Sequence, residues 1–277
     1  PLKRLAADRD FAERSGLCGI NSYNLGRPVA QTVHYFWSYF RALDQRGMDV
    51  GSPVDFVLPA GALGNLAAGF MAKRMGLPVR RLVAGVNAND ITHRTFSRGE
   101  FHRSEKMEKT LSDAINIQVP YNMERIFYYL TDGDTALVAA WMAEMEASGR
   151  FTLPTPWLAK LGEVFGSCRV DDSAMSSALR RGVEAHGYLA DPHTAVGLQA
   201  AWQTYGDEPE AALPTVVVLA TASACKFEQS IREALGDRRW SEYANGPEFP
   251  ELAKAVLAAP ERPFSRLASV GTLAESQ

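Results

Sequence analysis

Apolar residues recur at helical spacing in several segments and form short continuous runs in others. Val29, Val33, Phe36, Phe40 and Leu43 fall on one face of a helix, and Pro28 suits the first turn of that helix. The same kind of spacing or a capping residue predicts further helices over 66–75, 123–130 and 137–145, from 171 towards 186, and from 191 through 202. These segments predict a chain rich in amphipathic helices.

Three short apolar runs predict strands, over 54–58, 81–86 and 215–220. The first two enclose the helix at 66–75, whose end is marked by Gly76 and Pro78. This order is a βαβ unit, whose strands should be parallel. The third run is continuously apolar, which is typical of a strand at the centre of a parallel sheet. We therefore expect an α/β fold with a mostly parallel sheet flanked by helices.

The regular pattern weakens in two places. Residues 87–122 are richer in polar side chains and predict irregular chain with short helices, and long irregular segments in a compact domain tend to carry function. After about residue 236, several prolines indicate a peripheral helix and a tail. The expected division is a ligand-binding α/β region over 1–235 and a peripheral part over 236–277.

Composition excludes several classes of partner. A net charge of -3 and a pI near 6.0 leave no basic field for nucleic acid. No apolar run reaches membrane-spanning length and the N-terminus has no signal core, so we expect a soluble protein without a membrane partner. Cys18, Cys168 and Cys225 are widely spaced, with no histidine at zinc-ligand spacing. This predicts neither disulfides nor a metal site, and favours a reducing cytoplasmic setting.

The turn PAGALGN at 59–65 follows the first strand and precedes a helix. It lacks the Gly-Lys-Ser/Thr ending of a nucleotide P-loop and the spacing of a dinucleotide fold. Gly61 and Gly64 let backbone amides approach a ligand closely, and the helix presents its positive end there. The turn therefore predicts a phosphate site. The alternative is an ordinary βα turn whose glycines only relieve backbone strain.

Other polar residues also lie where a ligand can be expected. Thr221 and Ser223 follow the strand at 215–220, and open α/β sheets bind ligands at the carboxyl ends of their strands, although helix capping is the alternative. Three further clusters are Ser22, Asn24 and Arg27, at the end of a probable strand and the start of a helix; Asp90, His93 and Arg94; and Asn122 and Arg125. Arginine, amide and hydroxyl groups suit phosphate or carboxylate, whereas capping and surface roles are the alternatives. His193 is expected to pack at a helix start, and Cys225 to be a small buried side chain.

Several motifs together resemble a known family. They are NSYNLGRPVAQ at 21–31, PAGALGN at 59–65, VNANDITHR at 86–94, TLSDAINIQVPYNMER at 110–125, DPHTAVG at 191–197 and LATASACKF at 219–227. In this order they resemble threonine synthase, in its fungal and enterobacterial branch, and also threonine synthase-like proteins. The resemblance implies an enzyme dependent on pyridoxal 5'-phosphate (PLP) with fold type II, the tryptophan synthase β-like fold.

The resemblance also implies roles for particular residues. The family's phosphate loop, Gly-Asn-Phe-Gly-Asn, corresponds to Gly61-Ala62-Leu63-Gly64-Asn65, with both central side chains changed. The family threonine facing the pyridine nitrogen of PLP matches Thr221. A neutral hydroxyl there leaves the ring nitrogen largely unprotonated. Ser22, Asn24, Arg27, Asp90 and Arg94 are the residues we expect to contact substrate.

The implied reaction converts O-phosphohomoserine and water to threonine and phosphate. It needs a lysine as Schiff-base partner and proton carrier, and the family's lysine lies in an upstream motif. No lysine here has that context, and Lys226 matches a different family segment. We therefore expect the C-terminal part of a threonine synthase, inactive alone, whose N-terminal domain and lysine lie upstream of Pro1. Two alternatives stay open: a phospholyase that releases 2-oxobutyrate from phosphohomoserine or O-phosphothreonine, and a truncated non-catalytic binding or signalling form.

Overall fold

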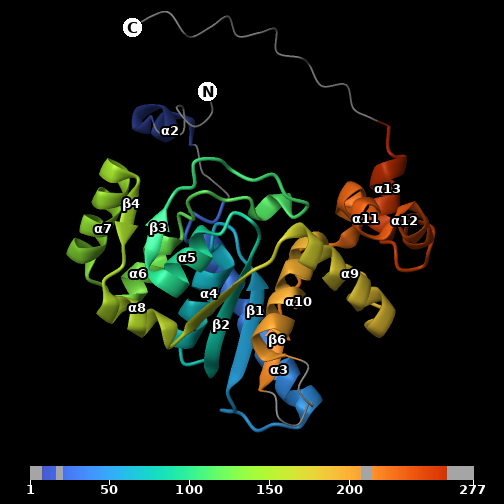
Figure 1. Ribbon diagram of the computed structural model, residues 1–277, viewed down its shortest axis with the longest axis horizontal. Coiled ribbons are helices and arrows are strands. Elements are labelled where there is room, and N and C mark those ends of the chain that lie inside the picture. The colour runs from blue at the N-terminus through green and yellow to red at the C-terminus, as the bar shows by residue number, and fades with distance from the viewer. Residues whose placement is uncertain (1–7, 17–20, 207–213, 261–277) are drawn as a thin grey trace, which may run out of the picture.

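A four-stranded parallel sheet lies at the centre of the computed structural model, which describes residues 8–16, 21–206 and 214–260 (Figure 1). Its strands, in spatial order, are β5 (Phe165–Arg169), β2 (Val79–Val86), β1 (Val54–Pro59) and β6 (Thr215–Val218). All three neighbouring pairs are parallel. The predicted α/β class and the parallel βαβ unit, formed by β1, α4 (Gly64–Arg74) and β2, are confirmed.

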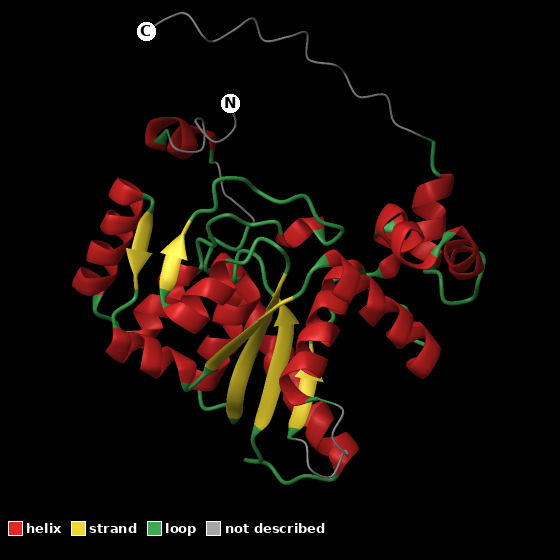
Figure 2. Ribbon diagram, in the orientation of Figure 1, coloured by secondary structure: helices red, strands yellow, loops and turns green. Residues whose placement is uncertain are grey.

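Helices cover both faces of this sheet (Figure 2). Successive side chains of a strand point to opposite faces, and Phe56 packs in the core beneath α3 (Gly26–Arg46) and α4, while Val57 packs in a second core with α9 (Asp172–His186) and α10 (Pro192–Tyr205). The sequence predicted all four of these helices. Because both faces are covered, the carboxyl ends of the strands are left as the place where loops can form a site.

A smaller unit packs beside the β5 edge of the sheet. It contains α5 (Ile91–Arg98), β3 (Glu100–His102), α6 (Met123–Leu130), α7 (Thr135–Ser148), β4 (Arg150–Thr152) and α8 (Thr155–Gly162). The 3₁₀ turn η1 (Asp113–Ile115) lies apart from this unit, and its Ile115 packs in the core with α9 and α10. β3 and β4 pair antiparallel, and Phe101, Phe127, Trp141 and Phe151 fill the core between the helices and this ribbon. The predicted irregular segment with short helices is confirmed for 87–122, although β3 was not predicted.

Short helices gather at the C-terminal side. They are η3 (Ala224–Lys226), α11 (Glu228–Leu235), α12 (Asp237–Ala244) and α13 (Glu251–Ala258), and at the N-terminal side α2 (Arg9–Ser15) stands apart from the sheet (Figure 1). The predicted boundary after residue 235 falls between α11 and α12. Ile231 of α11 and Trp240 of α12 pack in one small core with Phe249. Two helices, α12 and α13, occupy the described part of the segment where one helix was expected. The predicted tail over 261–277 lies outside the described residues.

The helix α3 forms where it was predicted, but its buried face was assigned wrongly. Val33 is 63% exposed and Val29 and Phe40 are about half exposed, whereas Tyr35 and Tyr39 are completely buried. The two tyrosine hydroxyls donate to backbone carbonyl oxygens, of Asn65 at 2.8 Å and of Ser52 at 3.1 Å. Tyrosine can be buried when its hydroxyl finds such a partner, and a periodic apolar stripe alone does not reveal this.

Other expectations also differ from the structure. β6 lies at an edge of the described sheet, paired only with β1, and not at the centre as its apolar run predicted. Residues 21–25 form turns where the end of a strand was expected. β5 was missed because its sequence, FGSCR, has none of the β-branched residues that mark a strand.

No helix in 8–16, 21–206 or 214–260 is both long and apolar enough to cross a membrane. Over the same residues, no three histidine, cysteine or acidic side chains gather as metal ligands would. Cys168 and Cys225 are free thiols, and Cys18 lies outside the described residues.

Candidate functional site

The turn between β1 and α4 presents backbone N–H groups without helical partners. β1 ends at Pro59, and Leu63 has left-handed backbone angles (φ 63°, ψ 12°) immediately before α4 begins. A residue with a side chain costs about 1–2 kcal/mol in that conformation, so the surrounding contacts must hold it. The first N–H groups of an α-helix have no acceptor within the helix and carry its positive end. The turn can therefore bind an anion.

Close packing excludes a side chain at Gly64 and leaves little room for one at Gly61. A Cβ added at Gly61 would lie 3.0 Å from Ile115 Cα, and one added at Gly64 would lie 2.6 Å from Ser22 Cβ. Real Cβ atoms do not approach other atoms closer than 3.0 Å. The glycines thus let the turn sit against η1 and the 21–25 segment, which supports more than the relief of strain in an ordinary turn.

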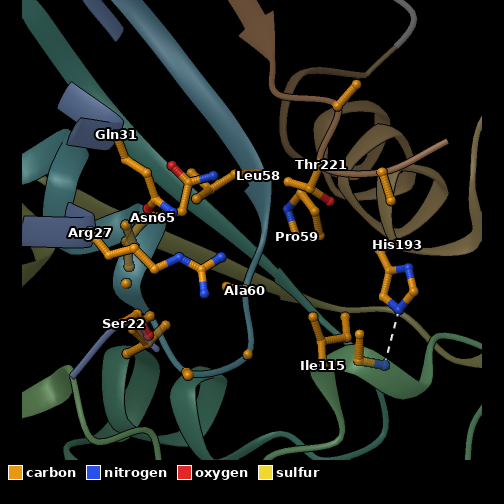
Figure 3. Close-up of a pocket in the computed structure, with 18 of the residues that line it drawn as sticks. Ser22, Arg27, Gln31, Leu58, Pro59, Ala60, Asn65, Ile115, His193 and Thr221 are labelled. Atoms are coloured by element: carbon orange, nitrogen blue, oxygen red, sulfur yellow. Dashed lines mark hydrogen bonds between the residues drawn. The ribbon is translucent and has the colours of Figure 1, made fainter. Parts of the chain in front are cut away.

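The turn forms the floor of a cavity of about 460 Å³ at the carboxyl end of the sheet. In Figure 3, Arg27 and Gln31 extend from α3 on one side of the end of β1, and Thr221 and His193 lie on the other side. The lining residues are Asn21, Ser22, Arg27, Gln31, His34, 58–66, Ala114, Ile115, His193, Ala220, Thr221, Ala222, Lys226 and Phe227. The described lining contains two cations, Arg27 and Lys226, and no carboxylate, so the cavity favours anionic ligands.

The cavity brings together most of the predicted site residues. The whole segment 61–65 and Thr221 line it, as do Ser22 and Arg27. Asn24 does not line it, because its Oδ1 accepts the Gly26 N–H at 3.0 Å at the start of α3, which was the alternative for this residue. Asp90 and Arg94 also lie outside the cavity lining.

Asn122, immediately before α6, and Arg125 in α6 stabilise the floor of the cavity through hydrogen bonds. The completely buried Asn122 amide donates to Ala62 O at 2.8 Å and to Ser22 Oγ at 3.1 Å. Arg125 Nη1 donates to Ser22 O at 2.7 Å. The third polar cluster of the sequence therefore supports the turn through its hydrogen bonds, as its structural alternative proposed.

Asp191 joins two walls of the cavity through a buried network. Its Oδ1 accepts the His193 N–H and Nδ1–H, each at 2.9 Å, and its Oδ2 accepts the Thr194 hydroxyl. His193 Nε2 accepts the Ala114 N–H at 3.0 Å (Figure 3), and Thr194 Oγ1 accepts the Thr221 N–H at 3.2 Å. Burial opposes ionisation of Asp191, but the hydrogen bonds from His193 and Thr194 outweigh it, so the pKa of Asp191 is lowered. His193 thus packs at a helix start, as expected, and also lines the cavity.

Asp90 and Arg94 use their charges on one another and on nearby chain. Arg94 Nε donates to Asp90 Oδ1 at 2.8 Å, and its other nitrogens donate to His102 Nε2 at 2.6 Å and His102 O at 3.1 Å. His93 Nδ1 lies 3.0 Å from Ser167 Oγ. The cluster ties α5 to β3 and to β5.

Some cavity residues were not predicted as site residues. Gln31 and His34 follow Arg27 by four and seven residues on α3, so all three lie on one face of the helix. That spacing was visible in the sequence, but its meaning depends on which face of α3 meets the sheet edge. Lys226 was assigned no role because its motif differs from that of the family lysine.

The fold is that of an α/β protein with an anion-favouring cavity at the carboxyl end of a parallel sheet. A sequence model described as "Threonine synthase, C-terminal" matches residues 194–270. Threonine synthase-like 2 of Pongo abelii is 39% identical over 234 residues, which are 84% of this chain and 48% of the relative. The chain spans about half the length of the curated relatives it matches.

Two solved structures extend the match to three dimensions. The yeast threonine synthase has 30% identity and a TM-score of 0.82, over 94% of this chain and 52% of that one. The PLP-bound threonine synthase of Brucella melitensis has 32% identity and a TM-score of 0.75, over 85% and 48%. The chain is similar to the threonine synthase family over the C-terminal part of its members. The predicted resemblance and the predicted fold type II are confirmed.

Proposed function

We propose that the cavity binds PLP, with the phosphate of PLP at the 61–65 turn and Thr221 at the ring nitrogen. The support is the fit of the group to the residues present: a glycine turn packed closely against η1 and Ser22, an anion-favouring helix start, and a hydroxyl in the same cavity. The Brucella relative is described as PLP-bound. When bound, PLP supplies an electron sink that stabilises a carbanion in an attached amino acid.

Backbone and side-chain groups of this chain would hold and orient PLP and the substrate. Backbone N–H groups of the turn bind the cofactor phosphate, so the changes at Ala62 and Leu63 leave that contact in place. The Thr221 hydroxyl is a neutral partner for the ring nitrogen. The backbone N–H of Thr221 donates to the Thr194 hydroxyl, which holds Thr221 in place. Arg27, which extends towards Ala60 in Figure 3, binds a carboxylate or phosphate of the substrate.

We further propose that the full-length protein is a threonine synthase, which converts O-phosphohomoserine and water to L-threonine and phosphate. The observation that carries this proposal is the glycine turn and Thr221 in one cavity, in a chain similar to the threonine synthase family. The proton-carrying lysine that the reaction needs would come from the half of the relatives that this chain does not span. The 277-residue chain alone should not turn over substrate.

The second candidate is a phospholyase that converts the same substrate and water to 2-oxobutyrate, ammonia and phosphate. The relatives named threonine synthase-like 2 reach 39% identity, compared with 35% for a fungal threonine synthase. The family loop is also changed at two positions here, Ala62 and Leu63. Whether water adds at Cβ depends on how the closed site holds it, so the product must be measured.

The test is to purify the full-length protein with PLP, supply O-phosphohomoserine, and quantify threonine, 2-oxobutyrate and phosphate together. Threonine equimolar with phosphate is expected. Ketoacid without threonine would establish the phospholyase instead, and the absence of both products together with the absence of PLP absorbance would leave only a non-catalytic form. Gly64→Ala is the matched variant, because the added methyl group would meet Ser22 and should remove cofactor binding.

A further inference from the structure

Lys226 lines the cavity, and its ammonium has no partner in the part of the chain that the structure describes. Lys226 ends η3, where its N–H donates to Ser223 O at 3.2 Å, and the next residue, Phe227, packs its ring 4.8 Å from that of His193. Within 8–16, 21–206 and 214–260, the Lys226 ammonium has no ion pair or hydrogen-bond partner. By contrast, Lys160 and Lys254 each contact a carboxylate, at 2.9 and 2.7 Å.

The distribution of charge in the cavity indicates a second anion. The 61–65 turn binds one phosphate with backbone groups and the helix end, and so needs no cationic side chain. The cavity lining nevertheless contains the Lys226 ammonium from η3, and no carboxylate is among its described lining residues. A second anionic group would be stabilised by this ammonium.

We propose that Lys226 binds the phosphate monoester of the substrate, at a subsite separate from the 61–65 turn. The inference rests on the proposed function and adds a ligand to it. The segment containing Lys226 also supplies Thr221, and its Phe227 packs on His193, so Lys226 comes from the same wall of the cavity as these two residues. A compact ammonium on a flexible stem suits a phosphate, because it can contact any of the three oxygens.

The experiment compares Lys226→Gln with the unaltered full-length protein saturated with PLP. Loss of a charge-assisted contact should raise the KM for O-phosphohomoserine roughly 10- to 100-fold and weaken inhibition by inorganic phosphate similarly. Binding of homoserine, which has the same carboxylate but no phosphate, should stay within about twofold, and so should PLP affinity measured by absorbance titration. Lys226→Arg should restore most of the phosphohomoserine affinity. Lys106→Gln, an exposed lysine outside the cavity lining, is the matched control and should change nothing.

Four results would overturn the inference. An unchanged KM means that Lys226 does not contact substrate, and equal weakening of homoserine and phosphohomoserine means that it binds the carboxylate. A tenfold loss of PLP affinity assigns Lys226 to the cofactor. A PLP adduct on Lys226, found by mass spectrometry after borohydride reduction, makes it the cofactor-linking lysine. Failure of the proposed function is measured separately, in the unaltered protein. If that protein neither binds PLP nor forms product, both proposals are wrong. If it forms product and the Lys226→Gln variant has the same kinetics, only the proposal for Lys226 is wrong.

Discussion

The sequence predicted ligand contacts both for residues that line the cavity and for Asp90 and Arg94. In the structure, the two regions differ in how many of their polar groups already have hydrogen-bond partners. Arg94 donates to Asp90 and to His102, so little of its hydrogen-bonding capacity remains for a ligand. In the cavity, the first N–H groups of α4 lack helical acceptors and Lys226 lacks a partner among the described residues. The comparison teaches that a binding site is recognised by the hydrogen-bonding capacity that folding leaves unused.

The largest effect on PLP affinity is expected from Gly64→Ala. The new Cβ would lie 2.6 Å from Ser22 Cβ and push the start of α4 away from its phosphate-binding position. Overpacking of this kind costs about 1–3 kcal/mol, and we expect both lower stability and at least a tenfold loss of affinity. Urea unfolding and PLP titration measure the two effects.

Gly162→Ala is the matched control, because a Cβ at Gly162 in α8 meets nothing within 4 Å. It should keep full PLP affinity and gain up to about 1 kcal/mol of stability from reduced chain entropy. If Gly64→Ala bound PLP as well as Gly162→Ala does, the turn would not be the phosphate cradle.

A smaller effect on affinity is expected from Asp191→Asn. The amide removes the charge from the network that joins Thr221 to η1, which should cost about 1–3 kcal/mol of stability and several-fold in PLP affinity. Asp171→Asn is the control, since Asp171 caps α9 by accepting the Ala174 N–H at 2.8 Å but is exposed. Asparagine caps a helix about as well as aspartate, so that change should be nearly neutral.

The Asp191→Asn variant also tests how the stability of the protein depends on pH. Because folding lowers the pKa of Asp191, its carboxylate contributes stability that is fully present above the ordinary value of 3.8 and is lost as the pH falls through the lower folded value. Unfolding midpoints measured from about pH 6 down to about pH 2 should therefore fall less steeply below about pH 4 in Asp191→Asn than in the unaltered protein. Parallel curves would show that Asp191 is not the charged centre of the network.

A still smaller effect is expected from Tyr35→Phe. The Tyr35 hydroxyl lies 2.8 Å from Asn65 O and 2.9 Å from Asn65 Oδ1, and so holds the last residue of the turn. Its loss should cost about 1 kcal/mol of stability and a few-fold in PLP affinity. Tyr39→Phe removes an equally buried hydroxyl that contacts Ser52 O instead. It should cost similar stability and leave PLP affinity unchanged, and an equal loss of affinity in both would contradict the role given to Tyr35.

No effect on PLP affinity is expected from Arg94→Leu. Arg94 is only 8% exposed and its hydrogen bonds connect α5 with β3, so the substitution should lower stability by about 1–3 kcal/mol. PLP titration and the KM for phosphohomoserine should match the unaltered protein when both are measured well below the unfolding temperature. A raised KM would return this cluster to the substrate site.

The sequence by itself determined the elements that depend on neighbouring residues. Periodicity located α3 and α4, capping residues located the starts of α9 and α10, and the apolar runs located β1, β2 and β6, because helix and strand formation depends on side chains a few positions apart. The glycine spacing of 61–65 identified the turn for the same reason. Motif order identified the resemblance to threonine synthase.

Only the tertiary structure decided which polar side chains share a cavity. Arg27 and Gln31 of α3 lie nearly 200 residues before Lys226 in the sequence. No local sequence pattern predicts that these residues line one cavity at the end of β1. Tertiary packing likewise buried the tyrosine face of α3, placed β6 at an edge of the described sheet, and paired Arg94 with Asp90. The reason is physical: the burial and the hydrogen-bond partners of a side chain are properties of the elements packed around it, and these lie far away along the chain.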